Sequence, residues 1–305
     1  MDFLSAIKSI AGEECIFCNE MMSDHTTFKV GGPAKYFVVP YRAEDIKKYI
    51  LAAEEYKIPY YVIGNGSNLL VSDKGYDGMI IMLGRDLGNI TVNGDRITAE
   101  AGTSLARPFN TARRHSLSGL EFAAGIPGTL GGACYMNAGA YGGEMKDVLT
   151  KVITIDRQGN THEYKQGEME LSYRNSIFIR KQEIILSAEM KLCKGDVEKM
   201  THKVNDLLEK RKEKQPLEYP SAGSTFKRPE GDFAGRLIEE CGLKGKGVNG
   251  AEVSEKHAGF IINRNNATAR DIYDTINLVT DTVLEKTGIK LEPEVRLLGD
   301  FSGNT

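Results

Sequence analysis

Hydrophobic residues in the first third of the chain occur in short runs, separated by one stretch with a helical period. Short apolar runs bounded by turn residues are typical of buried strands, and they occur here at 36–39, 60–63, 79–83 and 96–101. Residues 44–56 predict a helix that ends before Pro59. Its apolar positions recur on one face: Ile46, Tyr49, Ile50 and Ala53.

Residues 150–192 change to an all-strand pattern. The runs 151–156 and 161–164 flank the turn residues Arg157–Asn160, which predicts a hairpin. A longer run at 183–192 predicts a third strand. Since no helical period interrupts these runs, we expect β-structure throughout this part.

A helical period returns after Gly195. Apolar residues recur at helical spacing from Val197 to Leu208, and the predicted helix ends in the charged run Lys210–Lys214. The change of pattern places a domain boundary near residue 195, with an α+β unit after it.

The last part of the chain alternates helices and a strand. The pattern predicts a short helix at 233–241 and a strand at 259–263. A long helix is predicted at 269–287, because Thr268 and Asp271 form a capping-box pattern before it and Gly288 follows it.

Composition excludes several classes of protein. The chain has 305 residues, 41% of them hydrophobic, with a formal net charge of −3. This composition is too apolar for a disordered chain and too acidic to indicate nucleic-acid binding. No run reaches the ~18 apolar residues that span a bilayer, and the acidic N-terminal segment is not a signal peptide. We therefore expect a cytoplasmic protein without a membrane anchor.

The cysteines do not indicate a disulfide framework. They are an odd, scattered set, as expected of reduced thiols in a cytoplasm: Cys15, Cys18, Cys134, Cys193 and Cys241. Cys15 and Cys18 have the spacing of half a metal site, but no second Cys/His pair follows at ligand spacing. Two ordinary thiols on an N-terminal helix are therefore favoured, and no metal is expected.

Glycine is enriched, at 33 residues, and the informative ones form two clusters. The first, Ile63–Leu70, follows a predicted strand. Gly64 and Gly66 allow backbone N–H groups to point at one anion, which suits a pyrophosphate. Ser67 and Asn68 can add side-chain donors. The cluster lacks the lysine of a P-loop and the third glycine of a Rossmann motif, so a plain turn between two strands remains an equally good interpretation.

The second cluster, Gly119–Gly143, contains eight glycines and one charged residue, Glu121. We expect a long loop whose backbone, at Gly125–Gly128 and at Gly131–Gly132, can approach a flat ligand closely. The alternative is a glycine-rich surface loop. The two clusters together suit a dinucleotide with a large planar ring.

Three polar segments are candidates for chemistry. Tyr173–Ser176 precedes the apolar residues 177–179, Ser224 follows a glycine in Ser221–Pro229, and Glu294 begins a predicted strand. Each also has an ordinary interpretation: a turn before a strand, a Ser/Gly loop and a surface strand. The residues alone therefore support only a cytoplasmic protein that binds a large nucleotide cofactor.

Six segments, in this order, resemble the family of UDP-N-acetylenolpyruvoylglucosamine reductases. They are Thr27–Ala34, GNGSNLL at 64–70, AAGIPGTLGGACYMNAGAYGGE at 123–144, YRNSIF at 173–178, AGSTFKRP at 222–229 and EPEVRLLG at 292–299. The resemblance implies an α+β fold of three domains. Domains 1–83 and 84–195 would form an FAD-binding unit of the vanillyl-alcohol-oxidase (PCMH) type. Domain 196–305 would bind the UDP-sugar, and its last strand would return Glu294 to the active site.

The resemblance also implies a reaction, the NADPH-dependent reduction of the enolpyruvyl ether of UDP-N-acetylglucosamine to UDP-N-acetylmuramate in peptidoglycan synthesis. FAD would be bound non-covalently, NADPH would be a co-substrate, and the protein would be a monomer. Arg174 would stabilise the charge that develops at the substrate carboxylate. Glu294 would assist as a protonated carboxyl, and Ser224 would give a proton to the α-carbon with help from Lys212, Lys214 or Lys227.

The matching motifs also imply binding residues. For FAD these are Gly64, Asn65, Gly66, Ser67, Asn68, Leu69, Gly125, Ile126, Pro127, Gly128, Gly132, Asn137, Gly139 and Tyr141. For the UDP-sugar, Tyr173 lies in a matching motif. The candidates for its diphosphate are chosen by charge: Lys212 in the run 210–214, Lys227, Arg228 and Arg296. A solvated helix end is an equally good interpretation of the run 210–214.

The short connection between the second glycine cluster and Tyr173 leaves no room for an inserted substrate-capping loop. The chain therefore resembles the second subclass of the family, which lacks that loop and its tyrosine. The alternatives are another FAD-dependent oxidoreductase of the same fold, such as a carbohydrate or alcohol oxidase, and a non-catalytic nucleotide-binding module. Oxidases of this fold often attach FAD to a histidine, and neither glycine cluster contains one.

Overall fold

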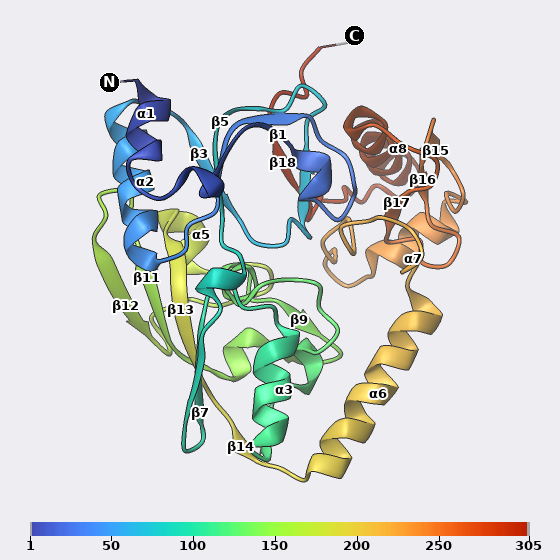
Figure 1. Ribbon diagram of the computed structural model, residues 1–305. Helices are drawn as coiled ribbons and strands as arrows, with labels where there is room; N and C mark the ends of the chain where they lie inside the picture. Colours follow the sequence, from blue (N-terminus) through green and yellow to red (C-terminus); the bar gives the residue numbers. More distant parts are fainter. Residues whose placement is uncertain (1, 304–305) are drawn as a thin grey trace. The chain divides into compact units, whose positions relative to one another are not determined.

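The computed structural model describes residues 2–303, apart from the side chain of Arg85 (Figure 1). Its contacts divide the chain into two compact units, each with its own hydrophobic core. Unit 1 comprises Met1–Phe17, Tyr36–Asn65 and Gly78–Lys210, and unit 2 comprises Cys18–Lys35, Gly66–Asp77 and Arg211–Thr305. The division into domains 1–83, 84–195 and 196–305 stays a prediction.

An antiparallel sheet of five strands forms the centre of unit 1. Its order is β12-β11-β13-β7-β6, and Figure 1 shows β12, β11 and β13 side by side. Alternate residues such as Val152 and Ala188 are buried in the core, and α4 (Leu130–Tyr135) packs against β13. The strands are β6 (Ile90–Asn93), β7 (Arg96–Glu100), β11 (Leu149–Ile155), β12 (Thr161–Lys165) and β13 (Ile184–Lys191). The four strands predicted at 96–101 and within 150–192 are thereby confirmed.

The helix α2 and a parallel strand pair complete much of unit 1. α2 (Ala43–Glu55) buries the predicted face of Ile46, Tyr49, Ile50 and Ala53. β3 (Tyr60–Ile63) pairs in parallel with β5 (Tyr76–Met82). The remaining elements of this unit include α1 (Phe3–Lys8), α3 (Ala106–Arg114), and the paired short strands β8 (Leu117–Ser118) and β14 (Cys193–Lys194).

A second sheet has the order β1-β2-β5-β3, with β1 at Ile16–Met21 and β2 at Pro33–Val38. The expectation that Cys15 and Cys18 lie on an N-terminal helix was wrong, because Cys18 lies on β1 and Cys15 lies in a short 3-10 turn. The N-terminal helix predicted to hold both cysteines ends at Lys8. Gly12 follows, a residue that disfavours helix, and the chain then enters the sheet.

Two further expectations were wrong. The second glycine cluster is not one long loop: it contains a 3-10 turn, α4, and the hairpin of β9 (Gly139–Ala140) and β10 (Gly143–Glu144). Thr129 starts α4 as its N-cap, since its side chain accepts from the Gly132 N–H. Residues 177–181 form a helix, α5 (Ile177–Lys181), where a strand was expected, so the part 150–192 is not all-strand.

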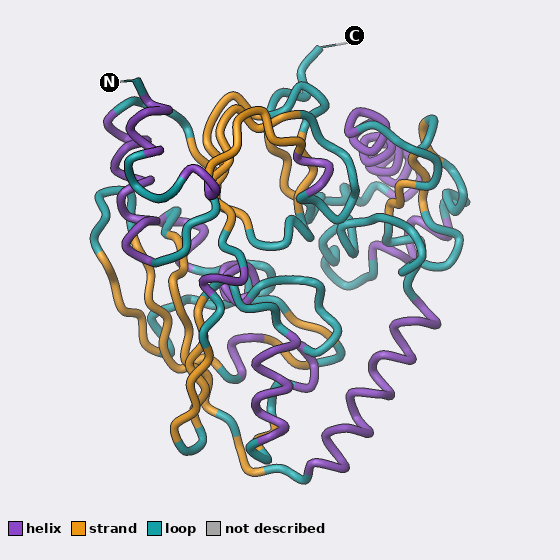
Figure 2. Tube along the Cα trace, viewed as in Figure 1, coloured by secondary structure: helices purple, strands orange, loops and turns teal. Residues whose placement is uncertain are grey.

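Unit 2 packs a long helix against a small sheet. α8 (Ala269–Thr287) lies against the strands β15 (Gly247–Val248), β16 (Ala251–Val253) and β17 (Ile261–Asn263) (Figures 1 and 2). β4 (Leu69–Val71) pairs in parallel with β18 (Arg296–Leu298), although these strands are far apart in the sequence. The other helices are α7 (Ala234–Glu240) and α6 (Val197–Lys214), which contains the boundary between the units after Lys210.

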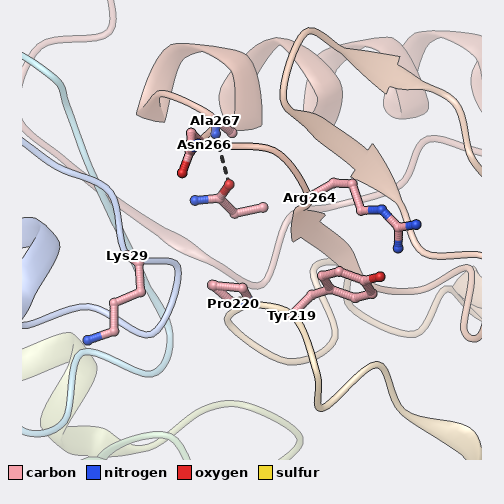
Figure 3. Close-up of a pocket in the computed structure, with 7 residues that line it drawn as sticks. Lys29, Tyr219, Pro220, Arg264, Asn266 and Ala267 are labelled. Carbon is pink, nitrogen blue, oxygen red and sulfur yellow. Dashed lines mark hydrogen bonds between the residues drawn. The ribbon is translucent and has the colours of Figure 1, made fainter.

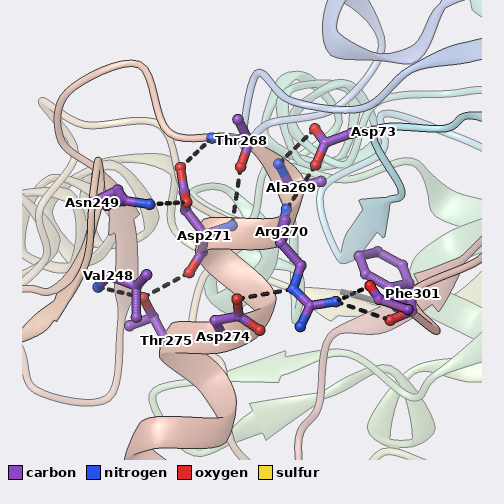
Figure 4. A network of polar contacts seen from close by, with 11 residues as sticks. Asp73, Val248, Asn249, Thr268, Ala269, Arg270, Asp271, Asp274, Thr275 and Phe301 are labelled. Atoms are coloured by element: carbon purple, nitrogen blue, oxygen red, sulfur yellow. Dashed lines mark hydrogen bonds and ion pairs between the residues drawn. The ribbon is translucent and has the colours of Figure 1, made fainter. Parts of the chain in front are cut away.

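The start of α8 has a hydrogen-bond acceptor for each of its first amides (Figure 4). Thr268 and Asp271 form the predicted capping box, and Asp73 accepts from the N–H groups of Ala269 and Arg270, at 2.8 Å each. Burial alone would raise the pKa of Asp271. Hydrogen bonds from Thr268 and Asn249 outweigh it and hold that pKa below its usual value.

We expect Asp73→Ala to lower the free energy of unfolding by about 1 kcal/mol, because it removes the acceptor for two amides at the positive end of a helix. Denaturant unfolding at neutral pH measures this. Asp77→Ala is the matched control, since Asp77 lies in the same segment as Asp73 and forms an exposed ion pair with Lys35. Equal effects of the two substitutions would contradict the capping role.

Candidate active site

The two glycine clusters meet in unit 1. A Cβ on Gly64 would lie 2.2 Å from the Thr129 hydroxyl oxygen, so the backbone at Gly64 is in close contact with the second cluster. Thr129 is 3% exposed, and its hydroxyl accepts from the Gly132 N–H at 3.4 Å. Asn65 and Gly132 are both exposed beside this contact. The segments predicted to serve one dinucleotide therefore lie together.

The second cluster presents two accessible stretches. Gly125–Gly128 is half-buried to exposed, whereas Ala123 and Leu130 on either side are buried. At the tip of the β9–β10 hairpin, Tyr141 and Gly142 have φ values of 51° and 86°, as a type I′ turn requires, and Tyr141 is 48% exposed. Accessible backbone and an exposed ring fit a large planar ligand such as a flavin.

Other glycines of this cluster are explained by protein packing. A Cβ would lie 2.8 Å from the Ala101 Cβ at Gly131, 2.7 Å from the Gly143 carbonyl oxygen at Gly139, and 2.8 Å from the Phe122 ring at Gly143. At Gly132 the nearest contact would be an ordinary 3.6 Å. The glycine excess therefore serves the fold as well as any ligand.

Arg174 lies in a tight turn of unit 1. Ser172 and Asn175 exchange two backbone hydrogen bonds, at 3.1 and 3.2 Å, so Tyr173 and Arg174 form the tip. Arg174 has φ = 52°, a left-handed conformation uncommon for a residue with a side chain. Its guanidinium carbon is 5.5 Å from the centre of the Tyr173 ring. Such backbone conformations concentrate at functional sites.

Ser224 and Glu294 are brought together in unit 2. The segments that carry them pair through Glu294 N–H to Thr225 O at 2.7 Å and Lys227 N–H to Glu292 O at 2.8 Å. Thr225 is fully buried, whereas Ser224 is exposed and Glu294 half-buried. The pairing thus brings the backbone segments that carry the two predicted catalytic residues together in this unit.

The rest of the first glycine cluster joins the same region of unit 2. The Asn68 amide donates to the Glu294 carbonyl oxygen at 3.2 Å, and the Arg296 N–H donates to Asn68 O at 3.1 Å. Gly66 has φ = 57°, and its backbone lies against the His25 carbonyl. A predicted FAD segment and a predicted catalytic segment therefore share one hydrogen-bonded strand pair.

The predicted basic residues have varied surroundings. Lys227 forms an ion pair with Glu292, and the Arg228 guanidinium lies 4.6 Å from the Phe233 ring centre. Lys212 and Lys214 are exposed in the last turn of α6. Arg296 begins β18 and is half-buried.

Comparison with known proteins agrees with this arrangement. Residues 34–165 match the model of an FAD-binding domain, and residues 215–298 match the model of the UDP-N-acetylenolpyruvoylglucosamine reductase C-terminal domain. The UDP-N-acetylenolpyruvoylglucosamine reductase of Caldanaerobacter subterraneus subsp. tengcongensis is 49% identical over 96% of this chain and 97% of its own. The enzyme of the same name from Clostridium novyi is 48% identical over 100% of this chain and 99% of its own. The chain belongs to the UDP-N-acetylenolpyruvoylglucosamine reductase family.

Similarity to a solved structure also supports the family assignment. The MurB crystal structure from Thermus caldophilus matches with a TM-score of 0.79 and 35% identity, over 92% of this chain and 98% of that one. A glucose oxidase variant of Phl p 4 matches with a TM-score of 0.53 and 14% identity, over 65% of this chain and 45% of that one, which shows the fold alone. Reductases of this family are flavoprotein oxidoreductases of peptidoglycan synthesis that use FAD and NADPH, and the predicted α+β fold with a PCMH-type FAD-binding unit is confirmed.

A separate pocket of the reductase, in unit 2, has a cavity volume of about 340 Å³ (Figure 3). The Asn263 amide lies at its wall, donating to Phe28 O at 3.1 Å and accepting from the Ala267 N–H at 2.8 Å. The charged ends of Lys29 and Arg264 point away from each other in Figure 3. None of the site residues predicted from the sequence lines this pocket.

Thr225, beside Ser224, depends on a turn that contains His257. The Thr225 N–H donates to Gly259 O at 2.8 Å, and the Gly259 N–H in turn donates to His257 Nδ1 at 3.0 Å. Burial lowers the pKa of His257 below 6.5. A protonated Nδ1 could not accept the Gly259 N–H, so the neutral ring belongs to the folded state.

We expect the reductase to lose stability as the pH falls below 6.5. The pKa of His257 is lower in the folded than in the unfolded state, so the unfolded state binds the proton first; the contribution is complete above pH 6.5 and is lost as the pH falls through the folded-state pKa. His257→Asn keeps an acceptor for Gly259 but cannot titrate. Unfolding free energies between pH 7.5 and about 5.5 should fall less steeply for the variant; parallel curves would contradict the role of His257.

Three residues that organise the site are not among those predicted from the sequence. Thr129 joins the glycine clusters, Ser176 bonds to the Tyr135 carbonyl, and Asp73 bonds to α8. Only Thr129 carries a local signal, as a threonine directly before a helix. The other two act through contacts between distant segments, which a residue pattern does not reveal.

Residues 2–303 contain neither a candidate membrane span nor a candidate metal-binding cluster. No helix among them is long and apolar enough to cross a membrane. No group of three or more His, Cys, Asp or Glu side chains within them is arranged to hold a metal ion; Cys15 is buried and Cys18 exposed.

Proposed function

We propose that this reductase converts the enolpyruvyl ether of UDP-N-acetylglucosamine to UDP-N-acetylmuramate with Arg174, Ser224 and Glu294 as its catalytic residues. The activity follows from family membership, at 49% identity over nearly the whole chain. The observation that best supports the residue roles is the pairing of the Ser224 and Glu294 segments, because it brings the segments that carry an alcohol and a carboxyl together.

The FAD-holding residues are proposed to be those of the two glycine clusters. Backbone N–H groups at 64–68 suit a diphosphate, and the accessible stretch 125–128 with Gly132, Gly139 and Tyr141 suits the larger body of the cofactor. When bound, FAD would supply the enol ether with the hydride that it has received from NADPH. The protein's own residues would bind the enol ether, stabilise the negative charge that develops at its carboxylate and protonate its α-carbon.

Arg174 is proposed to bind the substrate carboxylate. When the vinyl carbon is reduced, negative charge spreads from the α-carbon into that carboxylate. A guanidinium stays charged and can donate two parallel hydrogen bonds to it. Glu294 is proposed to assist as a protonated carboxyl, since only the acid form can donate to the same group.

Ser224 is proposed to protonate the α-carbon. An unaided hydroxyl is a weak acid, so a nearby cation must stabilise the alkoxide that remains. Lys212, Lys214 and Lys227 are the candidates. The ion pair with Glu292 makes Lys227 the least available of the three.

The remaining proposals concern the substrate contacts, the subclass, the oligomeric state, the location in the cell and the preferred nicotinamide cofactor. Tyr173, Lys212, Lys227, Arg228 and Arg296 are proposed to contact the UDP-sugar, the basic ones at its diphosphate. The chain is proposed to be of the second subclass, a monomer and cytoplasmic, with NADPH preferred over NADH. The short connection between Glu144 and Tyr173 supports the subclass.

The deciding experiment measures NADPH oxidation by the purified flavoprotein with and without the enolpyruvyl UDP-sugar. We expect oxidation that depends on the sugar and yields UDP-N-acetylmuramate. Oxidation at the same rate without the sugar would contradict the proposal. Flavin that stays with acid-precipitated protein would contradict non-covalent binding.

A further inference from the structure

The buried side chain of Asn137 joins the second glycine cluster to the turn that carries Arg174. Its amide nitrogen donates to the Ser172 carbonyl oxygen at 3.0 Å and to a Glu144 carboxylate oxygen at 2.5 Å, and its amide oxygen accepts from the Lys146 N–H at 2.9 Å. Asn137 is 2% exposed. Both amide N–H groups are therefore used inside the protein, which leaves none for a cofactor.

Two tight turns depend on this one amide. Glu144 ends the hairpin with Tyr141 at its tip, and Ser172 begins the turn with Arg174 at its tip. Asn137 itself has φ = 46°, a conformation that asparagine adopts more readily than most residues. The residue type therefore fits both the backbone conformation and the two donors that the position requires.

A second bond ties the other end of the Arg174 turn to the same segment. The Ser176 hydroxyl donates to the Tyr135 carbonyl oxygen at 2.5 Å, and Ser176 is 1% exposed. Tyr135 ends α4, two residues before Asn137. The turn is thus held on both sides of Arg174, at Ser172 and at Ser176, by residues 135–137.

We propose that Asn137 and Ser176 are positioning residues that set the place of the Arg174 guanidinium against the flavin-binding segment. The inference rests on the role proposed for Arg174, and it assigns to Asn137 a function other than FAD contact. A guanidinium that must meet a developing charge tolerates little displacement, because a misplacement of ~1 Å can cost about 100-fold in rate.

The test separates the two half-reactions of Asn137→Gly and Ser176→Ala by stopped-flow flavin absorbance. Glycine tolerates the left-handed conformation at 137 and removes the side chain that makes these hydrogen bonds. We expect both variants to bind FAD and to be reduced by NADPH at nearly wild-type rates, and their reoxidation by the enolpyruvyl UDP-sugar to slow about 10- to 100-fold. Ser176→Thr should restore much of the rate. Asn266→Gly, at an exposed position with φ = 51°, controls for the substitution itself.

A double-mutant cycle decides whether these residues act through Arg174. In the Arg174→Met background, Asn137→Gly and Ser176→Ala should slow reoxidation little further. Full additivity, or weakened FAD binding with unchanged reoxidation, would overturn the inference, as would wild-type reoxidation rates in both single variants. A wild-type protein that is not reoxidised by the enol ether would instead contradict the proposed function.

Discussion

Arg174→Met should lower kcat with the enolpyruvyl UDP-sugar by at least about 100- to 1000-fold, the usual cost of removing one group that stabilises developing negative charge. Methionine keeps much of the side-chain length but removes the charge and the forked donors. The left-handed backbone at this position, φ = 52°, is as unfavourable for methionine as for arginine, so the substitution adds no backbone strain. Steady-state NADPH oxidation, with product identification, measures the effect.

The matched control is Arg180→Met. Arg180 lies on α5, close in sequence to the same turn, and makes an exposed ion pair with Glu170. It should keep nearly wild-type kcat, since exposed ion pairs contribute little. Arg174→Lys should fall between the two, because it retains charge without the fork. Near-wild-type turnover by Arg174→Met would show that charge stabilisation lies elsewhere.

Local periodicity predicted the regular elements well. The helix at 44–56 exists with its predicted buried face, and the helix at 269–287 exists with its predicted capping box and terminal glycine. The helix from 197 also exists, but Leu208 is 43% exposed and only Met200 and Val204 are buried. These signals are local, because they depend on the spacing of apolar residues and of capping residues within a few helical turns.

The site is harder to predict because its geometry comes from long-range contacts. The Asn68 amide meets the Glu294 carbonyl across 226 residues of sequence, and unit 2 draws on three separate segments of the chain. The role of a glycine likewise depends on contacts with segments far away in the sequence. From the sequence Gly131 and Gly143 suit a ligand, whereas in the structure Ala101 and Phe122 occupy the space that their side chains would need.

Ser224→Ala should separate the two half-reactions completely. The variant flavoprotein should still lose its flavin absorbance on addition of NADPH, because nothing in that step requires the hydroxyl. Turnover with the enol ether should fall about 100-fold or more, the usual contribution of a positioned general acid. Stability should be nearly unchanged, since Ser224 is exposed and substitutions at exposed positions usually stay within about 0.5 kcal/mol.

Ser221→Ala provides the matched control within the same loop, where Ser221 forms a backbone bridge with Ile262 that alanine can keep. It should reduce and reoxidise at wild-type rates. If Ser224→Ala also keeps both rates, Ser224 is not the acid, and attention moves to Glu294 on the paired segment. A variant slow in both half-reactions would instead show that this loop affects binding of the cofactor or of NADPH, because a proton donor to the substrate acts only after the flavin has been reduced.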